Sequence, residues 1–161
     1  MLTEQMIQLI STYTIGCVAT VRLDGAPAVS PKATFVVIDD RTIAFANIRS
    51  QGTVENLRRH PQVEVNFIDI FKRIGCRVRG RARYSTFDEV QPEERRRFQE
   101  KWPDLYNLIR GIVRIDIAEA QSLSSPSYDI GASQSGLSDH WLKHYATVLG
   151  FVVQQQTEGP F

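Results

Sequence analysis

Residues 27–61 constrain the fold of this chain more than any other stretch, because they join two β patterns to one short helix. Pro27 to Ile38 alternates as a strand does, and Asp39-Asp40 supplies turn residues. Thr42 to Asn47 then resumes the β pattern, and Pro61 ends the helix that follows. The stretch therefore predicts a β-hairpin that leads directly into a helix.

The start of that helix has the chemistry of a phosphate site. Ser50 is a good N-cap, and it places three residues in the first turn: Gln51, Gly52 and Thr53. Unpaired backbone N–H groups and the positive end of the helix dipole would attract a phosphate there, and Gly52 leaves room for close approach. Arg49 and Lys32 would add donors, with Lys32 on the opposite strand face from Val29. The same residues also fit an ordinary hairpin with a surface helix that binds nothing.

Several motifs, taken in their order along the chain, resemble one known family. They are V-S-P-K, F-A-N, a Ser-Gln-Gly-Thr segment, N-L-R-R-H-P-Q-V and a later R-V-R-G strand. Over about residues 13–120 the chain is similar to the pyridoxamine 5'-phosphate oxidase-like FMN-binding split barrels. The resemblance implies that Lys32 and the segment 47–53 hold the FMN phosphate and ribityl chain. It also implies that Ala46 and Asn47 face the flavin.

The chain departs from the oxidase itself at two places. Gly52 and Thr53 stand where the oxidase has an Arg-Lys pair, and its arginine-bearing C-terminal substrate motif is not visible. These differences argue against pyridoxamine phosphate as the substrate more than against FMN as the cofactor. The predicted cofactor site comprises ten residues: Val29, Ser30, Lys32, Ala46, Asn47, Arg49, Ser50, Gln51, Gly52 and Thr53. None is a proton-transfer group suited to catalysis, so no catalytic residue is predicted.

Length and composition indicate a single domain over residues 1–161, in a soluble, cytoplasmic protein. An apolar fraction of 42% and a charged fraction of 23% are ordinary for a globular chain, and no apolar run reaches the length of a membrane helix. A formal charge of +1 gives little support for nucleic acid or a membrane as partner. Cys17 and Cys76 lie in separate strand patterns without metal spacing, so both are expected to be reduced and buried.

The remaining patterns predict a mainly β fold, a six-stranded antiparallel split β-barrel with short peripheral helices. The expected strands are 15–22, 27–38, 42–47, 62–68, 77–83 and 111–120, and the expected helices are 3–12, the one after Ser50, 92–101 and 140–150. Thr3 is expected to cap the first helix, Asp24-Gly25 to form a hairpin turn, and Pro92 to stand at the first position of the third helix. The barrel core would span about residues 13–120. The segment 121–138 is rich in Ser, Gly and Pro and is expected to be a loop, Asp139 to cap the last helix, and 151–161 to be a loose tail.

Two clusters allow other interpretations. Arg77, Arg79, Arg81 and Arg83 alternate with small and apolar residues, so four guanidinium groups share one face. They could bind an anion or a nucleic-acid strand, but an exposed face paired to Glu64 and Asp116 on neighbouring strands is the favoured interpretation. His140 and His144 are four residues apart and could reach a metal or haem, although a solvated pair is favoured and no metal site is predicted.

The function that these features favour is that of an FMN-binding oxidoreductase, which passes a hydride or electrons between a nucleotide-type donor and a small organic substrate. Two alternatives remain open: a haem-binding or haem-degrading split barrel, and a flavin-binding sensor without turnover. A six-stranded barrel is filled by its own side chains, so the flavin ring would lie outside it. We therefore expect a homodimer with the flavin at its interface, as the resemblance also implies. The segment 121–138 and the helix with Trp141 are candidates to cover the ring.

Overall fold

A computed structural model of the chain describes residues 1–151. These residues form two compact units, one of residues 1–68 with 75–123, the other of 69–74 with the described residues from 124 on. The single domain over 1–161 stays a prediction. Apart from Phe151, the expected loose tail lies outside the described residues.

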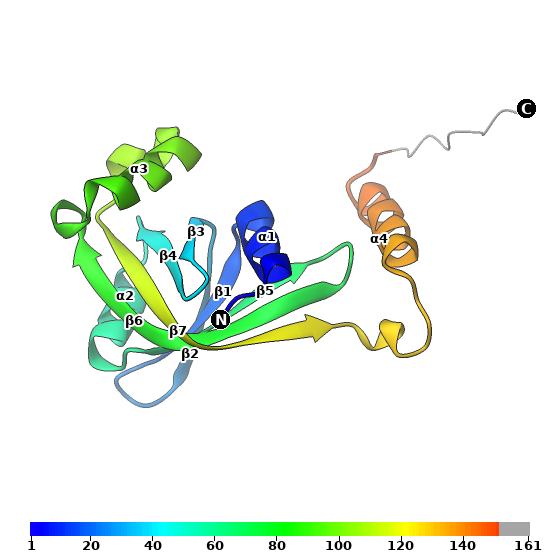
Figure 1. The fold of residues 1–161 in the computed structure, drawn as a ribbon, viewed down its shortest axis with the longest axis horizontal. Coiled ribbons are helices and arrows are strands. Elements are labelled where there is room, and N and C mark those ends of the chain that lie inside the picture. Colours follow the sequence, from blue (N-terminus) through cyan, green and yellow to red (C-terminus); the bar gives the residue numbers. More distant parts are fainter. Residues whose placement is uncertain (152–161) are drawn as a thin grey trace, which may run out of the picture. The chain divides into compact units, whose positions relative to one another are not determined.

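The described chain contains seven strands and four α-helices, with short 3-10 turns between them (Figure 1). The strands are β1 (Gly16–Val21), β2 (Pro27–Lys32), β3 (Phe35–Asp39), β4 (Thr42–Asn47), β5 (Gln62–Asp69), β6 (Ile74–Thr86) and β7 (Gly111–Ser124). The helices are α1 (Glu4–Tyr13), α2 (Gln51–Arg59), α3 (Pro92–Lys101) and α4 (Gln134–Val148). The 3-10 turns are η1 (Phe87–Glu89), η2 (Pro103–Leu108) and η3 (Pro126–Tyr128). A mainly β fold with antiparallel pairing and peripheral helices is confirmed.

The sheet has seven strands rather than the six expected, because the predicted strand 27–38 is two strands. The order across the sheet is β2-β1-β5-β6-β7-β4-β3, so β2 and β3 are consecutive in the chain but lie at opposite ends. Thr34, between them, uses its hydroxyl to accept from the Ala46 N–H at 3.0 Å and to donate to the Ala46 carbonyl at 3.3 Å. A side chain thus replaces the backbone hydrogen bonds between strands at this point, and the chain passes from one end of the sheet to the other.

The sheet of the first unit curls around an aromatic core. The Phe35 ring on β3 lies 4.8 Å from the Phe67 ring on β5, although three strands separate β3 from β5 in the sheet order. The Phe45 ring lies 5.2 Å from Phe35, and all three side chains are fully buried. A Cβ on Gly16 would approach the Phe67 ring to 2.7 Å, so only glycine fits there. The interior is therefore filled by side chains, as expected for a small barrel.

Helices and turns cover the outside of the same unit (Figure 1). Thr3 caps α1, as predicted, and accepts from the Met6 N–H at 3.3 Å. The opposite face of β4 packs against a second apolar cluster, in which Ala44 and Ala46 meet Phe98 of α3. Helix α3 begins with Pro92 at its first position, again as predicted.

In the second unit, the end of the predicted loop 121–138 is helical. Strand β7 continues to Ser124, and α4 begins at Gln134, five residues before the expected cap. The cap is Ser133 rather than Asp139, because the Ser133 hydroxyl accepts from the Gly136 N–H at 3.1 Å. Within this unit the helix contacts residues 69–74: the Tyr145 ring lies 5.8 Å from Phe71.

Candidate functional site

The N-terminus of α2 is held by Asn47 rather than by the predicted cap, Ser50. The Asn47 side-chain oxygen accepts from the Ser50 N–H at 3.0 Å, whereas the Ser50 side chain makes no capping hydrogen bond. Asn47 is the last residue of β4 and is itself buried. Its amide nitrogen donates to the Tyr84 hydroxyl at 3.5 Å. The start of the helix is therefore anchored to the sheet through two side chains.

Three backbone N–H groups at this helix start are available to a ligand. Within residues 1–151 no protein acceptor is found for the N–H groups of Gln51, Gly52 or Thr53, and the helical bonding begins with Val54 N–H to the Ser50 carbonyl at 2.9 Å. A Cβ built on Gly52 meets no atom within 4 Å, so the space beside this turn is open. The arrangement matches what an anion requires at a helix N-terminus.

A hollow of about 420 Å³ lies at this helix start. It is lined by Asn47, Ile48, Arg49, Ser50, Gln51, Gly52, Val54, Glu55, Arg58, Tyr84 and Arg110. Five of these were predicted site residues, so the structure brings the segment Asn47 to Gly52 together around one cavity. Thr53 is half-buried on the same helix turn but does not line the hollow.

Tyr84 and two arginines complete the hollow, and sequence reasoning missed all three. The Tyr84 hydroxyl donates to the Arg110 carbonyl at 3.3 Å, and the Arg58 guanidinium lies 5.0 Å above the Tyr84 ring. Gly111 makes this possible, because a Cβ there would lie 2.5 Å from the Tyr84 hydroxyl. Tyr84 of β6 and Arg110, which precedes β7, come near Asn47 through the neighbouring of β6, β7 and β4 in the sheet, which local spacing does not reveal.

The predicted residues on β2 lie away from the lining of this hollow. Ser30 pairs with Val18 and Lys32 with Gly16, so both share the inward face of β1, while Val29 lies on the outer face and is 67% exposed. Lys32 donates to the Ser30 hydroxyl, and burial lowers the pKa of Lys32 below its ordinary value. Ala46 is 4% exposed and packs in the apolar cluster beneath α3.

Helix α2 bridges the two groups of residues. Asn56 donates to the Thr20 hydroxyl of β1 at 3.0 Å, while Arg58 lies over Tyr84 at the end of β6. Residues two apart on a helix point in nearly opposite directions. One side of α2 therefore faces β1, the strand that pairs with β2, and the other side lines the hollow.

The arginine ladder on β6 is paired with acidic side chains, as the favoured interpretation expected. Arg77 lies 3.6 Å from Glu64 and Arg83 lies 2.9 Å from Asp116. Arg79 adds a third contact, 3.9 Å from Glu119. These paired groups are well exposed, so the ladder is a solvated face; of its four arginines, Arg81 has no ion pair among the described residues.

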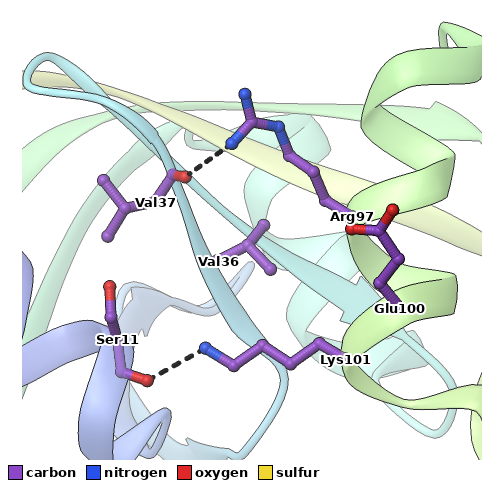
Figure 2. Close-up of a pocket in the computed structure, with 6 residues that line it drawn as sticks. All are labelled: Ser11, Val36, Val37, Arg97, Glu100 and Lys101. Atoms are coloured by element: carbon purple, nitrogen blue, oxygen red, sulfur yellow. Dashed lines mark hydrogen bonds between the residues drawn. The ribbon is translucent and has the colours of Figure 1, made fainter.

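A second hollow, of about 380 Å³, contains none of the predicted site residues (Figure 2). Its cations are used to hold α3 in place. The Lys101 ammonium donates to the Ser11 carbonyl of α1 at 3.0 Å, and the Arg97 guanidinium donates to the Val37 carbonyl of the edge strand β3 at 3.4 Å. Figure 2 shows both side chains reaching from α3 toward these carbonyls, with Val36 between them. We assign this hollow a structural role.

The two histidines of α4 flank an indole ring. The His140 and His144 rings lie 5.2 Å and 5.3 Å from the Trp141 ring, and the Arg73 guanidinium lies 3.7 Å above it. Within residues 1–151 no group of three or more His, Cys, Asp and Glu side chains is placed to hold a metal ion. The geometry therefore shows an aromatic contact between α4 and the 69–74 hairpin.

The two cysteines differ in environment, and the expectation that both are buried is wrong for Cys17. Cys17 lies on the outer face of β1 and is exposed, because the alternation of the strand buries its neighbour Val18 instead. Cys76 is buried, and this burial raises the pKa of its thiol to about 11.

In the part of the chain that the structure covers, no helix is long and apolar enough to cross a membrane.

Comparison with known proteins places these features in a family. The model of the family described as pyridoxamine 5'-phosphate oxidase matches residues 2–127. A comparison with curated protein sequences gives no match.

Solved structures with the same fold include HupZ from Group A Streptococcus, with 23% identity and a TM-score of 0.66; the match covers 78% of this chain and 96% of HupZ. An FMN-binding protein from Syntrophomonas wolfei has 17% identity and a TM-score of 0.63, with 76% and 86% covered. An F420 reductase has 20% identity and a TM-score of 0.60, with 74% and 98% covered.

Proposed function

The chain belongs to the pyridoxamine 5'-phosphate oxidase family, and we propose that it binds FMN and acts as an FMN-dependent oxidoreductase. The observation that carries this proposal is the start of α2, where three N–H groups have no protein acceptor within residues 1–151 and two of their residues, Gln51 and Gly52, line a hollow. The proposal draws further support from similarity in fold to a protein described as FMN-binding and to another described as an F420 reductase.

The residues present fit the phosphate end of FMN. The N–H groups of Gln51, Gly52 and Thr53 would donate to the phosphate oxygens, and Arg49 lines the same hollow. Asn47 holds this turn in place through its bond to Ser50 N–H, so little ordering is needed when the anion arrives. Ser50 adds a hydroxyl beside these donors.

Lys32 and Ser30 would approach the cofactor from the β2 side of the same helix. Burial partly desolvates the Lys32 ammonium and so lowers its pKa, and an anion beside it would favour the charged form and oppose this shift. Ser30 presents its hydroxyl next to Lys32 and would bond to the ribityl chain or the ring edge. Together these groups would hold FMN from two sides of α2.

The cofactor would supply the redox chemistry, by accepting and returning a hydride or electrons. The protein would supply binding, orientation and exclusion of water. In this role the donor is a nucleotide-type reductant and the acceptor is a small organic molecule. Gly52 and Thr53 stand in place of the oxidase's Arg-Lys pair, which argues against pyridoxamine phosphate as the substrate more than against FMN as the cofactor.

We also propose that the active unit is a homodimer with the flavin at its interface. The barrel interior is filled by Phe35, Phe45 and Phe67, so a flat tricyclic ring has no place inside it. The outer face near β2 leaves Val29 67% exposed, which is the kind of apolar surface that a second copy would cover. Light scattering on the FMN-loaded chain tests this: a monomer of 18.3 kDa that retains its FMN would contradict it.

Two measurements test the proposed activity. The purified, untagged protein should show the absorption spectrum of a bound flavin after incubation with FMN and removal of free cofactor. The steady-state rate at which nicotinamide cofactors reduce the flavin should then be higher for the FMN-loaded protein than for free FMN. A flavin spectrum without any accelerated reduction would indicate a sensor, and no flavin binding at all would reject the proposal.

A further inference from the structure

The hollow at α2 holds more positive charge than the proposed phosphate contacts use. Arg58 and Arg110 line it in addition to Arg49, and none of the three has an ion pair among residues 1–151. Glu55 is the acidic residue of the lining, and one of its oxygens already accepts from the Gln51 amide at 3.2 Å. The hollow therefore has a net positive character.

The arginines of β6 provide a contrast within the same molecule. Arg77, Arg79 and Arg83 each lie within 4.0 Å of a carboxylate, as is typical of charged residues on a solvated surface that binds no ligand. Arg58 and Arg110 lie on a concave surface, and no carboxylate within the described residues neutralises them. Their arrangement is therefore that of a binding surface rather than of a balanced exterior.

Tyr84 gives this part of the hollow a flat aromatic wall in a fixed position. Its hydroxyl is bonded to the Arg110 carbonyl and to the Asn47 amide, and its ring carries the Arg58 guanidinium 5.0 Å from the ring centre. The close fit against Gly111 prevents the ring from moving toward β7. A planar ligand group that displaces the Arg58 guanidinium from this ring can stack on the wall, while the displaced guanidinium and that of Arg110 bind phosphate beside it.

We propose that Arg58, Tyr84 and Arg110 form a second subsite, which binds the phosphate-bearing end of a nucleotide-type hydride donor. This inference rests on the proposed function, because it assigns the donor's binding site in an FMN-dependent oxidoreductase. The phosphate of FMN is held by the α2 N–H groups, Arg49 and the β2 residues, and the donor's phosphates are held by the two arginines that line the same hollow beside Tyr84. Tyr84 stacks on the donor's ring.

The test is isothermal titration of the FMN-loaded protein with ADP-ribose, the non-reducing portion of a nicotinamide donor. Wild type should bind one ADP-ribose per chain, and Arg58→Gln/Arg110→Gln should bind it at least tenfold more weakly. The Kd for FMN should stay within twofold. The matched control is Arg59→Gln/Arg81→Gln, which removes two exposed arginines that do not line the hollow and should leave both affinities unchanged.

Three results would overturn the subsite. ADP-ribose could bind the double variant as tightly as wild type, or the FMN affinity could fall by the same factor, which would put these arginines in the cofactor site. Inorganic pyrophosphate could bind wild type as tightly as ADP-ribose, which would show an anion site without nucleotide recognition.

If FMN itself does not bind to wild type, the proposed function fails separately. The titration is then run on the ligand-free chain beside Lys32→Ala. Loss of ADP-ribose binding in the Arg58/Arg110 variant alone still supports the subsite, and equal loss in Lys32→Ala contradicts it.

Discussion

The Asn47 side-chain oxygen accepts a hydrogen bond from the Ser50 N–H at 3.0 Å, so the last residue of β4 caps the helix that follows it. Ser50 has the residue type of an N-cap, but its side chain does not perform that role. Because Asn47 is also bonded to Tyr84, the position of the α2 start depends on the strand β6 as well as on β4. A phosphate site at this start would be fixed by the sheet before any ligand arrives.

Asn47→Ala should destabilise the fold, and Ser50→Ala should cost much less. Loss of the Asn47 cap leaves the Ser50 N–H without its acceptor, at a cost of about 0.5–2 kcal/mol in the free energy of unfolding. Urea unfolding of both variants checks this. If Ser50→Ala is the more destabilising change, the cap has been assigned to the wrong residue.

Lys32→Ala should weaken FMN binding while leaving the fold intact. A charge-assisted hydrogen bond is worth about 1.5–3 kcal/mol, so the Kd should rise roughly 10- to 100-fold. Titration with FMN measures the change, and a circular dichroism spectrum controls for folding. Unchanged affinity would mean that Lys32 serves only its bond to Ser30 and that the β2 side takes no part in binding.

FMN affinity should fall as the pH rises through the pKa of Lys32. Burial lowers this pKa below the ordinary lysine value, so the ammonium loses its proton earlier than an exposed lysine would. The FMN phosphate is already dianionic above pH 8, so its ionisation does not contribute to this change. Lys32→Ala is the matched control and should lose the alkaline decline; a decline of equal size in the variant would assign it to another group.

Without FMN, the ionisation of Lys32 should make the folded chain more stable as the pH rises, whereas it makes FMN binding weaker. Between the lowered pKa and the ordinary value the unfolded chain binds more protons at this position than the folded chain does. The free energy of unfolding therefore gains a contribution that increases with pH in that window. Comparing wild type with Lys32→Ala separates this contribution from other alkaline effects.

Glu94→Ala should destabilise the fold by about 1–3 kcal/mol, because it leaves a charged partner without its hydrogen bond. Glu94 is 7% exposed and accepts from the Arg114 guanidinium of β7 at 2.9 Å, which joins α3 to the sheet. Glu100→Ala on the same helix is the control. Its pair with Arg96 is exposed, and removing it should change stability by less than about 1 kcal/mol. Equal losses of stability in the two variants would show that burial of Glu94 does not make its pair with Arg114 more stabilising than an exposed pair.

Much of the fold could be predicted because it depends on local patterns. The Thr3 cap, the hairpin at Asp24-Gly25 and the Pro92 helix start each have a short signature, and the structure confirms them. The pairing of the arginine ladder with Glu64 and Asp116 was predicted correctly, because every second residue of a strand faces the same side of the sheet as its partners on the neighbouring strands. These features need no knowledge of distant contacts.

The features that were missed depend on contacts far apart in the chain. The break between β2 and β3 is made by Thr34 bonding to Ala46, twelve residues away. Tyr84 and Arg110 reach the hollow through strand pairing across the sheet. The predicted last helix begins too late, at residue 140, because Gly136 and the serines around it are typical of loops. In the structure Ser133 caps the helix.

The measurement that tests the central claim most directly is isothermal titration of the protein with FMN and, separately, with riboflavin. Most of the proposed donors converge on the phosphate, so FMN should bind at least tenfold more tightly than riboflavin, which has the same ring and no phosphate. Equal affinities would contradict the account, because the start of α2 would then not be a phosphate site.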